Sequence, residues 1–479
     1  MTTTPRRLIL LLGTILCALS IAGSIATSME VECDAGNDDG SCDAPDAAAD
    51  GRRARAKCED KEMECKHWAS MGECENNPKY MLFYCPISCD SCPEPLDLSK
   101  EEEDLLDAVA NYGVPQKVEA TDASKTFEVI RKTVAYMQND IHGPNPKHIL
   151  SEEVLAACTN RDDLCAFWAG NGQCEVNKNK AFMKTKCAPS CQTCEMIDMN
   201  VRCPPLGDDV RPGLLPGELN TMFERIVKTA PGNQTDENFK MEDGMMNYTV
   251  HVHSRPKPRD DDEEPISRER DLEQPPWVIT FNNFISEEEC NHLIKLGYGS
   301  GYKRSDDVGA LKVDGSYNPV KTVLRTSENA WCSYRDNCRN DPIVQQIYER
   351  LAKVTGIPPN SHEELQLLKY EQGQFYRPHH DYIDLQRDRR CGPRILTFFL
   401  YLSDVEEGGA TNFPELEIVV KPKVGRALLW PSVLNSNPKD KEPRTVHEAQ
   451  DVIKGTKFGA NAWLHLYDYM AAQEMGCAP

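Results

Sequence analysis

The chain has 479 residues, of which 40% are hydrophobic and 27% charged, and its formal net charge is −22 at pH 7. This length exceeds that of one ordinary core, so we expect two to four folded units. The negative charge argues against a nucleic-acid-binding protein, because such proteins present a basic patch. It permits a basic polypeptide partner, although soluble acidic linkers would account for the charge equally well.

The N-terminal segment predicts entry into the secretory pathway. Arg6 and Arg7 precede an uncharged apolar run over residues 8–26, in which small residues suit cleavage. As a helix rising about 1.5 Å per residue, this run would span roughly 28 Å, close to the hydrocarbon thickness of a bilayer. Residues 1–28 are therefore expected to be either a cleaved signal peptide or a signal anchor.

Both alternatives place the rest of the chain in the lumen of the endoplasmic reticulum or Golgi. The protein would be a single-pass type II membrane protein in one case and a secreted protein in the other. Acceptor triplets at Asn233 and Asn247 fit a glycoprotein of this compartment, although such triplets also arise by chance.

Cysteine usage supports the same compartment. The chain has 21 cysteines, and most of them fall in two short clusters. Residues 29–57, ahead of the first cluster, are acidic and rich in Ala, Gly and Asp, which predicts a flexible segment. Spacing assigns no partner to several cysteines outside the clusters: Cys33, Cys42, Cys203, Cys290, Cys391 and Cys477.

The two clusters are copies of one another. Their successive cysteine intervals are 7, 9, 11, 4, 3 and 7, 9, 13, 4, 3, and Trp68 and Trp168 occupy equivalent positions. The cysteines are Cys58, Cys65, Cys74, Cys85, Cys89 and Cys92 in residues 58–92, and Cys158, Cys165, Cys174, Cys187, Cys191 and Cys194 in residues 158–194.

Disulfides explain these clusters better than zinc does. Six cysteines can stabilise a unit that is too small to build its own core. A zinc site is less favoured, because neither copy has paired C-x₂-C knuckles or a histidine at ligand spacing. Spacing alone does not choose among the 15 possible connectivities.

The repeated segments resemble ShKT domains, which are small disulfide-bonded modules. The resemblance implies three disulfides in each copy. These are Cys58–Cys92, Cys65–Cys85 and Cys74–Cys89 in the first, and Cys158–Cys194, Cys165–Cys187 and Cys174–Cys191 in the second.

Two linkers separate the modules and the domain that follows them. Residues 93–157 are expected to be a linker with one short helix, since Phe127, Ile130, Val134 and Met137 recur at helical spacing. Residues 195–275 are rich in charge and proline, which predicts a solvated linker.

A catalytic domain is expected over residues 276–470. Ser286 and Glu289 form a capping box for a helix, and a second helix begins at Asp341-Pro342 and ends at Gly356. Strand patterns precede and follow these helices, over residues 277–284, 365–371, 394–402, 417–420, 426–430 and 458–466. Helices followed by strands predict an α+β domain built on a β-sandwich or jelly roll, flanked by helices.

Three side chains in this domain suit a metal. His379 and Asp381 are two residues apart, so in an extended chain they point to the same face while His380 points away. His447 would supply a second imidazole. Two histidines and one carboxylate form the facial triad of non-haem iron enzymes, whose open positions accept a 2-oxo acid and dioxygen.

Two further residues could hold a co-substrate. Lys457 follows His447 across Gly455 and could face the same cavity, where its ammonium would pair with a carboxylate. Tyr370 could donate a hydrogen bond to the same group. The simpler alternatives are an exposed strand lysine and a core tyrosine.

Residues 276–470 resemble prolyl 4-hydroxylases, especially those of the plant and algal type. The shared phrases are Asn283-Phe-Ile-Ser-Glu-Glu-Glu-Cys290, Arg325-Thr-Ser327, Tyr370-x-x-Gly373-Gln374-x-Tyr376-x-x-His379-x-Asp381, Tyr401-Leu-x-Asp-Val-Glu-Glu-Gly-Gly409, His447-x-Ala449, Gly455-x-Lys457 and Trp463-x-His465.

The resemblance implies a double-stranded β-helix and a role for each matching residue. His379, Asp381 and His447 would bind Fe(II), and Lys457 and Tyr370 would bind 2-oxoglutarate. Residues near the target proline would be Tyr376, Arg394 and Trp463, with Arg325 on a substrate loop. Ascorbate is the expected reductant.

The sequence departs from the family pattern in three places. Asp451 replaces a proline, and the basic stretch over residues 385–391 stands where relatives are glycine-rich, at the expected mouth of the site. Cys332 and Cys338 could form a local disulfide beside the substrate loop, or both could be free.

The predicted activity is 4-hydroxylation of proline in a polypeptide, with succinate and CO2 as the other products. One alternative is a 2-oxoglutarate oxygenase that acts on another peptidyl or free amino acid. A second is a secreted protein that binds a partner through its ShKT modules and carries an inactive oxygenase domain.

Overall fold

The computed structural model describes residues 60–91, 96–207, 209–234, 246–257, 267–333 and 338–478. The chain divides into two compact units, Met1–Cys92 and Pro93–Pro479. The predicted leader and acidic segment, with Cys33 and Cys42, lie outside the described residues. Within the described ranges, no helix is both long and apolar enough to cross a membrane.

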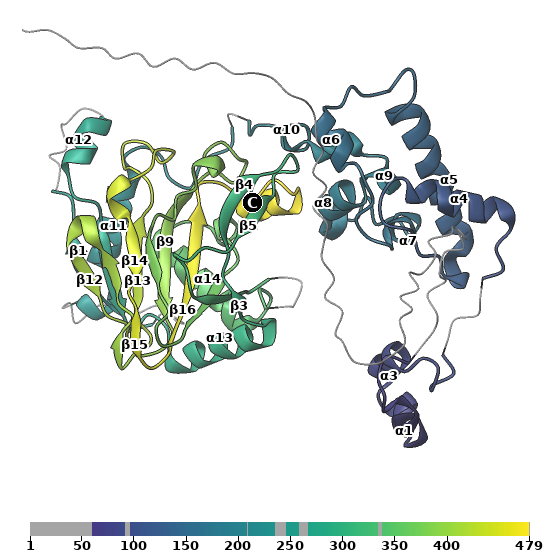
Figure 1. Cartoon of the computed structure of the whole chain (residues 1–479). Coiled ribbons are helices and arrows are strands. Elements are labelled where there is room, and N and C mark those ends of the chain that lie inside the picture. Colours follow the sequence, from purple (N-terminus) through teal and green to yellow (C-terminus); the bar gives the residue numbers. More distant parts are fainter. Residues whose placement is uncertain are drawn as a thin grey trace, which may run out of the picture. The chain divides into compact units, whose positions relative to one another are not determined.

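The first unit contains the first disulfide module, drawn in purple in Figure 1. Its helices are α1 (Cys65–Ser70), α2 (Glu73–Asn76) and α3 (Pro78–Tyr84). Cys65–Cys85 and Cys74–Cys89 pair as predicted. The predicted Cys58–Cys92 pair lies outside the described residues. Cys65, Met81 and Cys85 form a very small core, so the disulfides supply much of the stabilisation.

The second module has the same plan and belongs to the second unit. It contains α7 (Cys165–Gly170), α8 (Asn177–Lys186), α9 (Ala188–Cys191) and the 3₁₀ turn η3 (Cys194–Ile197). All three predicted disulfides are present, namely Cys158–Cys194, Cys165–Cys187 and Cys174–Cys191.

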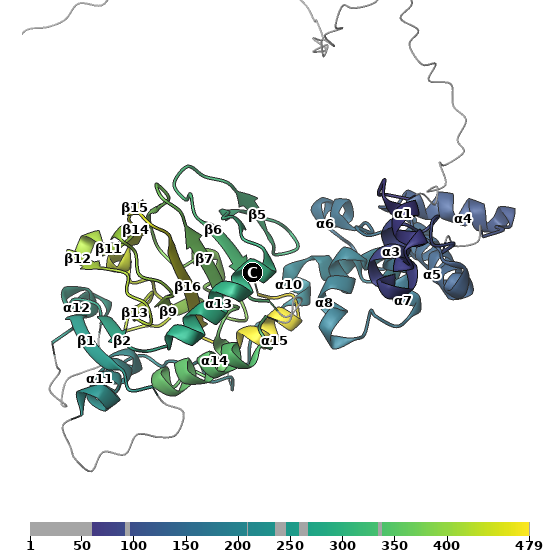
Figure 2. The same cartoon turned by 90° about the horizontal axis from the view of Figure 1, so that it is seen from below.

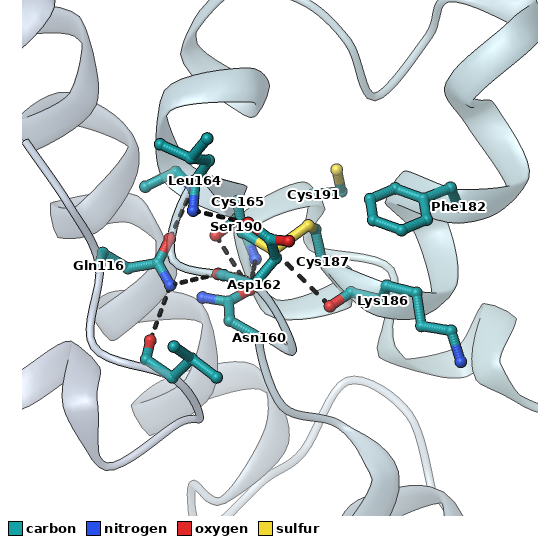
Figure 3. Close-up of a disulfide and its surroundings, with 12 residues drawn as sticks. Gln116, Asn160, Asp162, Leu164, Cys165, Phe182, Lys186, Cys187, Ser190 and Cys191 are labelled. Atoms are coloured by element: carbon teal, nitrogen blue, oxygen red, sulfur yellow. Dashed lines mark hydrogen bonds between the residues drawn. A yellow bond between two sulfur atoms is a disulfide. The ribbon is translucent and has the colours of Figure 1, made fainter. Parts of the chain in front are cut away.

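The segment before this module is more than a linker. It forms α4 (Lys100–Ala110), α5 (Ala123–Tyr136) and α6 (Glu152–Ala157). As the spacing predicts, Phe127, Ile130 and Val134 are buried, and they pack against Ala166 of the module. Gln116 accepts a hydrogen bond from the Ala166 amide at 2.8 Å and donates to the Asp162 carbonyl at 2.9 Å (Figure 3). The segment and the module therefore share packing and hydrogen bonds.

Residues 195–275 also differ from the predicted solvated linker. They contain α10 (Met199–Arg202), α11 (Glu218–Thr229), β1 (Thr249–Ser254) and α12 (Arg268–Glu273). In α11, Leu219, Met222, Phe223 and Ile226 fall on one face and join the main core. The catalytic domain therefore begins well before residue 276.

The catalytic domain is built on two sheets, drawn in teal to yellow in Figure 1. The large sheet has eight strands in the order β1-β2-β13-β9-β16-β7-β6-β3. Its remaining strands are β2 (Val278–Asn282), β3 (Lys303–Arg304), β6 (Glu328–Trp331), β7 (Gln366–Tyr370), β9 (Arg394–Tyr401), β13 (Ala427–Pro431) and β16 (Lys457–His465).

The small sheet has four strands in the order β12-β11-β14-β8. These are β8 (Tyr376–His379), β11 (Thr411–Phe413), β12 (Ile418–Val420) and β14 (His447–Ala449). Two separate two-stranded sheets pair β10 (Glu407–Gly408) with β15 (Val452–Lys454), and β4 (Asp307–Leu311) with β5 (Tyr317–Val320). This is the predicted jelly roll.

Alternate residues of the large sheet build two different cores. Phe398 faces α11, α13 (Glu287–Ser300) and α14 (Pro342–Thr355), while its neighbour Phe399 faces the small sheet. Figure 2 shows these helices along one side of the large sheet, with the small sheet on the other. The predicted capping box of Ser286 and Glu289 is present at the start of α13.

Two disulfides lie outside the repeated modules. Cys332–Cys338 is present, which settles the alternative of two free thiols at that position. Cys203 pairs with Cys477, which follows the last helix, α15 (Tyr469–Glu474), and this bond joins residues 274 apart in sequence. Cys290 and Cys391 are buried and are the unpaired cysteines of the described chain.

We expect Cys203–Cys477 to contribute more to stability than Cys332–Cys338. Constraining a long loop removes more entropy from the unfolded chain, so C203S/C477S should lower the free energy of unfolding by roughly 2–5 kcal/mol. The matched variant C332S/C338S opens a separation of only 6 residues. Chemical denaturation of both variants tests this, and equal losses would contradict it.

Candidate active site

Strand pairing brings the three predicted metal ligands together. β8 and β14 are antiparallel neighbours, and His379 and His447 are direct register partners. Asp381 follows β8, and one ligand atom from each of the three residues lies within 4.8 Å of the others. The Nε2 atoms of His379 and His447 are 3.9 and 3.6 Å from Asp381 carboxylate oxygens. The facial triad predicted from the sequence is therefore assembled.

Hydrogen bonds hold each ligand in the orientation that a metal requires. His379 Nδ1 donates to the Arg377 carbonyl at 2.9 Å, and His447 Nδ1 donates to the Thr445 carbonyl at 3.0 Å. These bonds place the proton on Nδ1 and leave Nε2 free to coordinate. Thr397, which the sequence did not single out, donates to Asp381 Oδ2 at 2.6 Å.

The electrostatics of the triad also suit a divalent cation. Burial and the neighbouring His447 hold the pKa of His379 well below its usual value, so its imidazole is neutral. Burial disfavours the Asp381 carboxylate, but the two imidazoles and the Thr397 hydrogen bond keep its pKa below the usual range. A neutral imidazole at His379 and an ionised carboxylate at Asp381 are the protonation states that suit coordination of Fe(II).

His380 points away from the triad, as alternation along the strand predicts. Its Nε2 donates to the Glu442 carbonyl at 2.7 Å, and its Nδ1 accepts from the Tyr382 amide at 2.8 Å. The Nε2 atom therefore binds the loop around Glu442, and the Nδ1 atom binds the backbone two residues further along the chain.

A buried lysine faces the same cavity. Lys457 begins β16 and is the register partner of Tyr370 in β7. It has no solvent-exposed surface, and its Nζ has no hydrogen-bond partner among the described residues. Aromatic rings lie around the ammonium, with the ring centres of Tyr370 and Phe399 at 5.1 and 5.2 Å from Nζ. Burial lowers the pKa of Lys457 to about 7.

An unpaired ammonium in this environment calls for an anion. The cavity has a volume of about 330 Å³, including the space open to solvent at its mouth. Its lining joins the triad to the lysine through residues Leu368, Tyr370, Tyr376, His379, Phe399, Thr411, Trp430, His447, Glu448, Ala449, Lys457 and Asn461. A small dicarboxylate could reach both ends.

Thr411 is a cavity residue that the sequence analysis missed. It follows Gly408-Gly409, and its Oγ1 is 2.7 Å from the Tyr401 hydroxyl. Gly408 has a φ of +80°, and a Cβ there would lie 2.2 Å from the Asp451 carbonyl oxygen. Glycine at position 408 permits this close approach of β10 to β15.

The predicted substrate residues Tyr376 and Arg325 lie together beside the triad. The Tyr376 ring stacks on the His379 ring with 3.5 Å between centres, and its hydroxyl donates to Asp307 Oδ1 at 3.2 Å. The Arg325 guanidinium lies 4.5 Å from the Tyr376 ring centre and donates to Gln366 Oε1 at 3.1 Å.

Arg394 and Trp463 form a second buried pair. The Arg394 guanidinium lies 3.5 Å from the Trp463 ring centre and binds Glu363 through two hydrogen bonds of 2.8 and 2.9 Å. Its charge is thus already paired, by a glutamate that the sequence analysis did not identify. Trp463 Nε1 is buried without a hydrogen-bond partner in the described part of the chain.

The basic stretch over residues 385–391 makes specific contacts of its own. Arg387 donates to Asp440 at 3.1 Å, Arg389 to the Gly315 carbonyl at 2.7 Å and Arg390 to the Pro204 carbonyl at 2.6 Å. These three guanidinium groups therefore bind other parts of the chain.

A double-stranded β-helix with a facial triad and a buried lysine defines a Fe(II)/2-oxoglutarate dioxygenase. The model of the 2OG-Fe(II) oxygenase superfamily matches residues 365–465, and the ShK domain-like model matches residues 57–92 and 157–194. Both matches agree with the sequence analysis.

Comparison with known proteins identifies the family of dioxygenases to which the chain is similar. Probable prolyl 4-hydroxylase 8 of Arabidopsis thaliana is 36% identical over 231 residues, which are 43% of this chain and 76% of that protein. Probable prolyl 4-hydroxylase 3 of the same plant is 34% identical over 215 residues, 40% of this chain and 71% of that protein. The chain belongs to the prolyl 4-hydroxylase family.

A solved structure is also similar. The viral collagen prolyl hydroxylase of Paramecium Bursaria Chlorella virus-1, in complex with 2OG, is 23% identical with a TM-score of 0.31. The match covers 39% of this chain and 95% of that one.

Replacing Lys457 should stabilise the protein when no ligand is bound. Because burial disfavours the ammonium, K457M should raise the free energy of unfolding near neutral pH by about 1–3 kcal/mol. The folded pKa lies below the unfolded one, so this gain should shrink as pH rises from about 7 toward the usual lysine pKa. Denaturation at several pH values tests this, with K454M, an exposed lysine paired with Glu406, as the control.

The affinity for 2-oxoglutarate should depend on pH. At pH values above about 7 the free Lys457 is mostly neutral, so binding a dianion takes up one proton. The dissociation constant should then rise by up to about tenfold per pH unit. Calorimetry on the zinc-substituted protein, in two buffers of different ionisation enthalpy, measures both quantities. An affinity that stays constant across this range would contradict the lowered pKa of the free Lys457.

Proposed function

We propose that the protein hydroxylates C4 of proline within a polypeptide, converting dioxygen and 2-oxoglutarate into succinate and CO2. The observation that carries this proposal is the convergence of His379, Asp381 and His447 with the unpaired Lys457 in one cavity. Membership of the prolyl 4-hydroxylase family supports proline as the acceptor.

One group of cavity residues would bind iron, and a second group would bind the co-substrate. His379, Asp381 and His447 would hold Fe(II), which when bound supplies the activation of dioxygen and the oxidation of the substrate C–H bond. Lys457 would pair with the distal carboxylate of 2-oxoglutarate, and Tyr370 and Thr411 would flank it. Apolar residues of the cavity lining, Leu368, Phe399 and Trp430, would limit the access of water, which strengthens the pairing of a carboxylate with the ammonium.

The substrate side is formed by the predicted aromatic residues. Tyr376 covers His379 and Trp463 presents an unused indole N–H, so both suit contact with a proline ring and its flanking carbonyl. Arg325 and Arg394 would act by holding these two rings in place, since each guanidinium lies over one of them. Ascorbate would serve as the reductant that keeps the iron in its ferrous state.

The secretory pathway is the proposed location. Disulfides within the described residues indicate an oxidising compartment. We propose that residues 1–28 direct the chain to the lumen of the endoplasmic reticulum or Golgi, as a cleaved signal or as a type II anchor through residues 8–26. Asn247 is exposed and is the better glycan acceptor, because the Asn233 amide donates to the Val250 carbonyl at 2.9 Å.

The activity is tested with the purified lumenal chain, Fe(II), 2-oxoglutarate, ascorbate and a panel of proline-rich peptides. We expect a mass gain of one oxygen atom per modified residue, with 4-hydroxyproline found by amino-acid analysis. H379A, D381A, H447A and K457M should each lose at least about a hundredfold in turnover, because each removes a ligand contact. K454M is the matched control.

The two alternatives make different predictions in the same assay. Hydroxylation of lysine peptides or of a free amino acid, with no change in proline, would replace the proposed acceptor. A lack of succinate with every peptide would indicate a partner-binding protein with an inactive oxygenase domain.

A further inference from the structure

One hairpin links the candidate active site to the second disulfide module. β4 (Asp307–Leu311) and β5 (Tyr317–Val320) pair only with each other, outside the large sheet and the small sheet. The hairpin exposes apolar side chains, with Val308, Leu311 and Val320 each between 41% and 51% exposed. Such a surface suits an apolar, proline-rich peptide better than a charged one.

The base of the hairpin lies beside the metal ligands. Asp307 opens β4 and accepts hydrogen bonds from the Tyr376 hydroxyl and from Thr322 Oγ1. Tyr376 in turn stacks on His379. Two contacts therefore connect the hairpin to the triad, and a shift of the hairpin would move the Tyr376 hydroxyl.

The tip of the hairpin lies against the second module. Val313 packs against the cluster that contains Val154, Cys158 and Cys194, and its carbonyl accepts from the Met199 amide at 3.2 Å. Gly315 has a φ of +79°, and a Cβ there would lie 2.5 Å from Met199 Sδ. The tip is thus closely fitted, and the fit needs glycine.

Asp314, at the tip, carries the ionic part of this contact. One carboxylate oxygen, Oδ1, accepts from the backbone and hydroxyl of Ser316 at 3.1 and 2.6 Å. The other, Oδ2, accepts from Arg161 Nη1 at 3.2 Å and Lys186 Nζ at 3.3 Å. Asp314 is only 9% exposed, whereas the Arg161 and Lys186 side chains are 32% and 36% exposed, so solvent screens these ion pairs in part.

Arg202 also contributes to the contact between the hairpin tip and the second module. Its buried guanidinium donates to the Asp314 carbonyl at 2.7 Å, the Ile197 carbonyl at 3.1 Å and the Gly476 carbonyl at 3.0 Å. These acceptors belong to the hairpin tip, the end of the second module and the C-terminal segment. The next residue, Cys203, forms the disulfide with Cys477, which fixes the junction covalently.

We propose that the second disulfide module holds the β4–β5 hairpin beside the active site and thereby sets the affinity for the peptide substrate. Arg161, Lys186 and Arg202 are then positioning residues that act through the hairpin and touch neither iron nor 2-oxoglutarate. The effect on peptide affinity rests on the proposed function, whereas the clamp on the hairpin does not.

The first test measures the clamp without any activity. D314N keeps the Oδ1 acceptor for Ser316 and removes only the oxygen that binds Arg161 and Lys186. In the full chain, D314N and R161Q/K186Q should each speed hydrogen–deuterium exchange of amides in residues 305–322 by about tenfold or more. Exchange in β9 and β16 should not change.

The control removes the same charge from the same module. Lys180 and Lys184 pair with Glu175 instead of the hairpin, so K180Q/K184Q should leave exchange at residues 305–322 unchanged. The charge-conserving variant R161K/K186R should keep it close to that of the parent chain. Unchanged exchange in D314N and R161Q/K186Q would overturn the proposal.

The second test measures substrate positioning. D314N and R161Q/K186Q should each raise the KM for the peptide by about tenfold, with kcat and the KM for 2-oxoglutarate unchanged. Combining D314N with R161Q/K186Q should add no further loss, since all three residues form one contact. A parallel rise in the KM for 2-oxoglutarate would indicate general damage to the fold and would overturn the positioning role. If the parent chain modifies no peptide, the proposed function fails, and the exchange result still decides the clamp.

Discussion

The register of two antiparallel strand pairs determines whether this protein has an active site at all. His379 is opposite His447 across β8 and β14, and Lys457 is opposite Tyr370 across β16 and β7. Because side chains alternate along a strand, a slip of one residue in either pair would turn its functional groups to the opposite face. The two hydrophobic cores prevent such slips, since each face of the large sheet is buried against a different layer.

The charged groups of the site would be neutralised by a bound metal cation and a bound anionic co-substrate. Lys457 is buried without a counterion among the described residues, while His379 is kept neutral and Asp381 is kept ionised. A buried, unpaired charge destabilises the protein when no ligand is bound. The hydrophobic cores on the two faces of the large sheet offset this cost. Apolar side chains packed around the cavity exclude water, and this strengthens the electrostatic interactions of these charges with a bound ligand.

Much of this arrangement could be predicted from the sequence because it depends on local patterns. The strands, the capping box at Ser286 and the helix from Asp341 to Gly356 follow periodicity and cap chemistry, and the structure confirms them. The triad followed from alternation and from the family motif. Five of the six predicted module disulfides are present, and the sixth lies outside the described residues.

The features that could not be predicted from the sequence depend on contacts between residues that are distant in the chain. The proline and charge of residues 195–275 obscured α11 and β1, although the apolar spacing from Leu219 to Ile226 was a usable signal. Glu363 and Asp314 are ordinary acidic residues in sequence, and only folding brings them to Arg394 and Arg161. Spacing likewise could not pair Cys203 with Cys477.

That last bond has a consequence for biosynthesis. Chains emerge from the ribosome starting at the N-terminus, so the thiol of Cys203 has to wait while 274 further positions are translated. During that interval it is an available nucleophile among the many cysteines of the upstream repeats, and mispairing competes with the native bond. Any mispaired bond of Cys203 therefore has to be corrected by thiol–disulfide exchange after translation has passed Cys477.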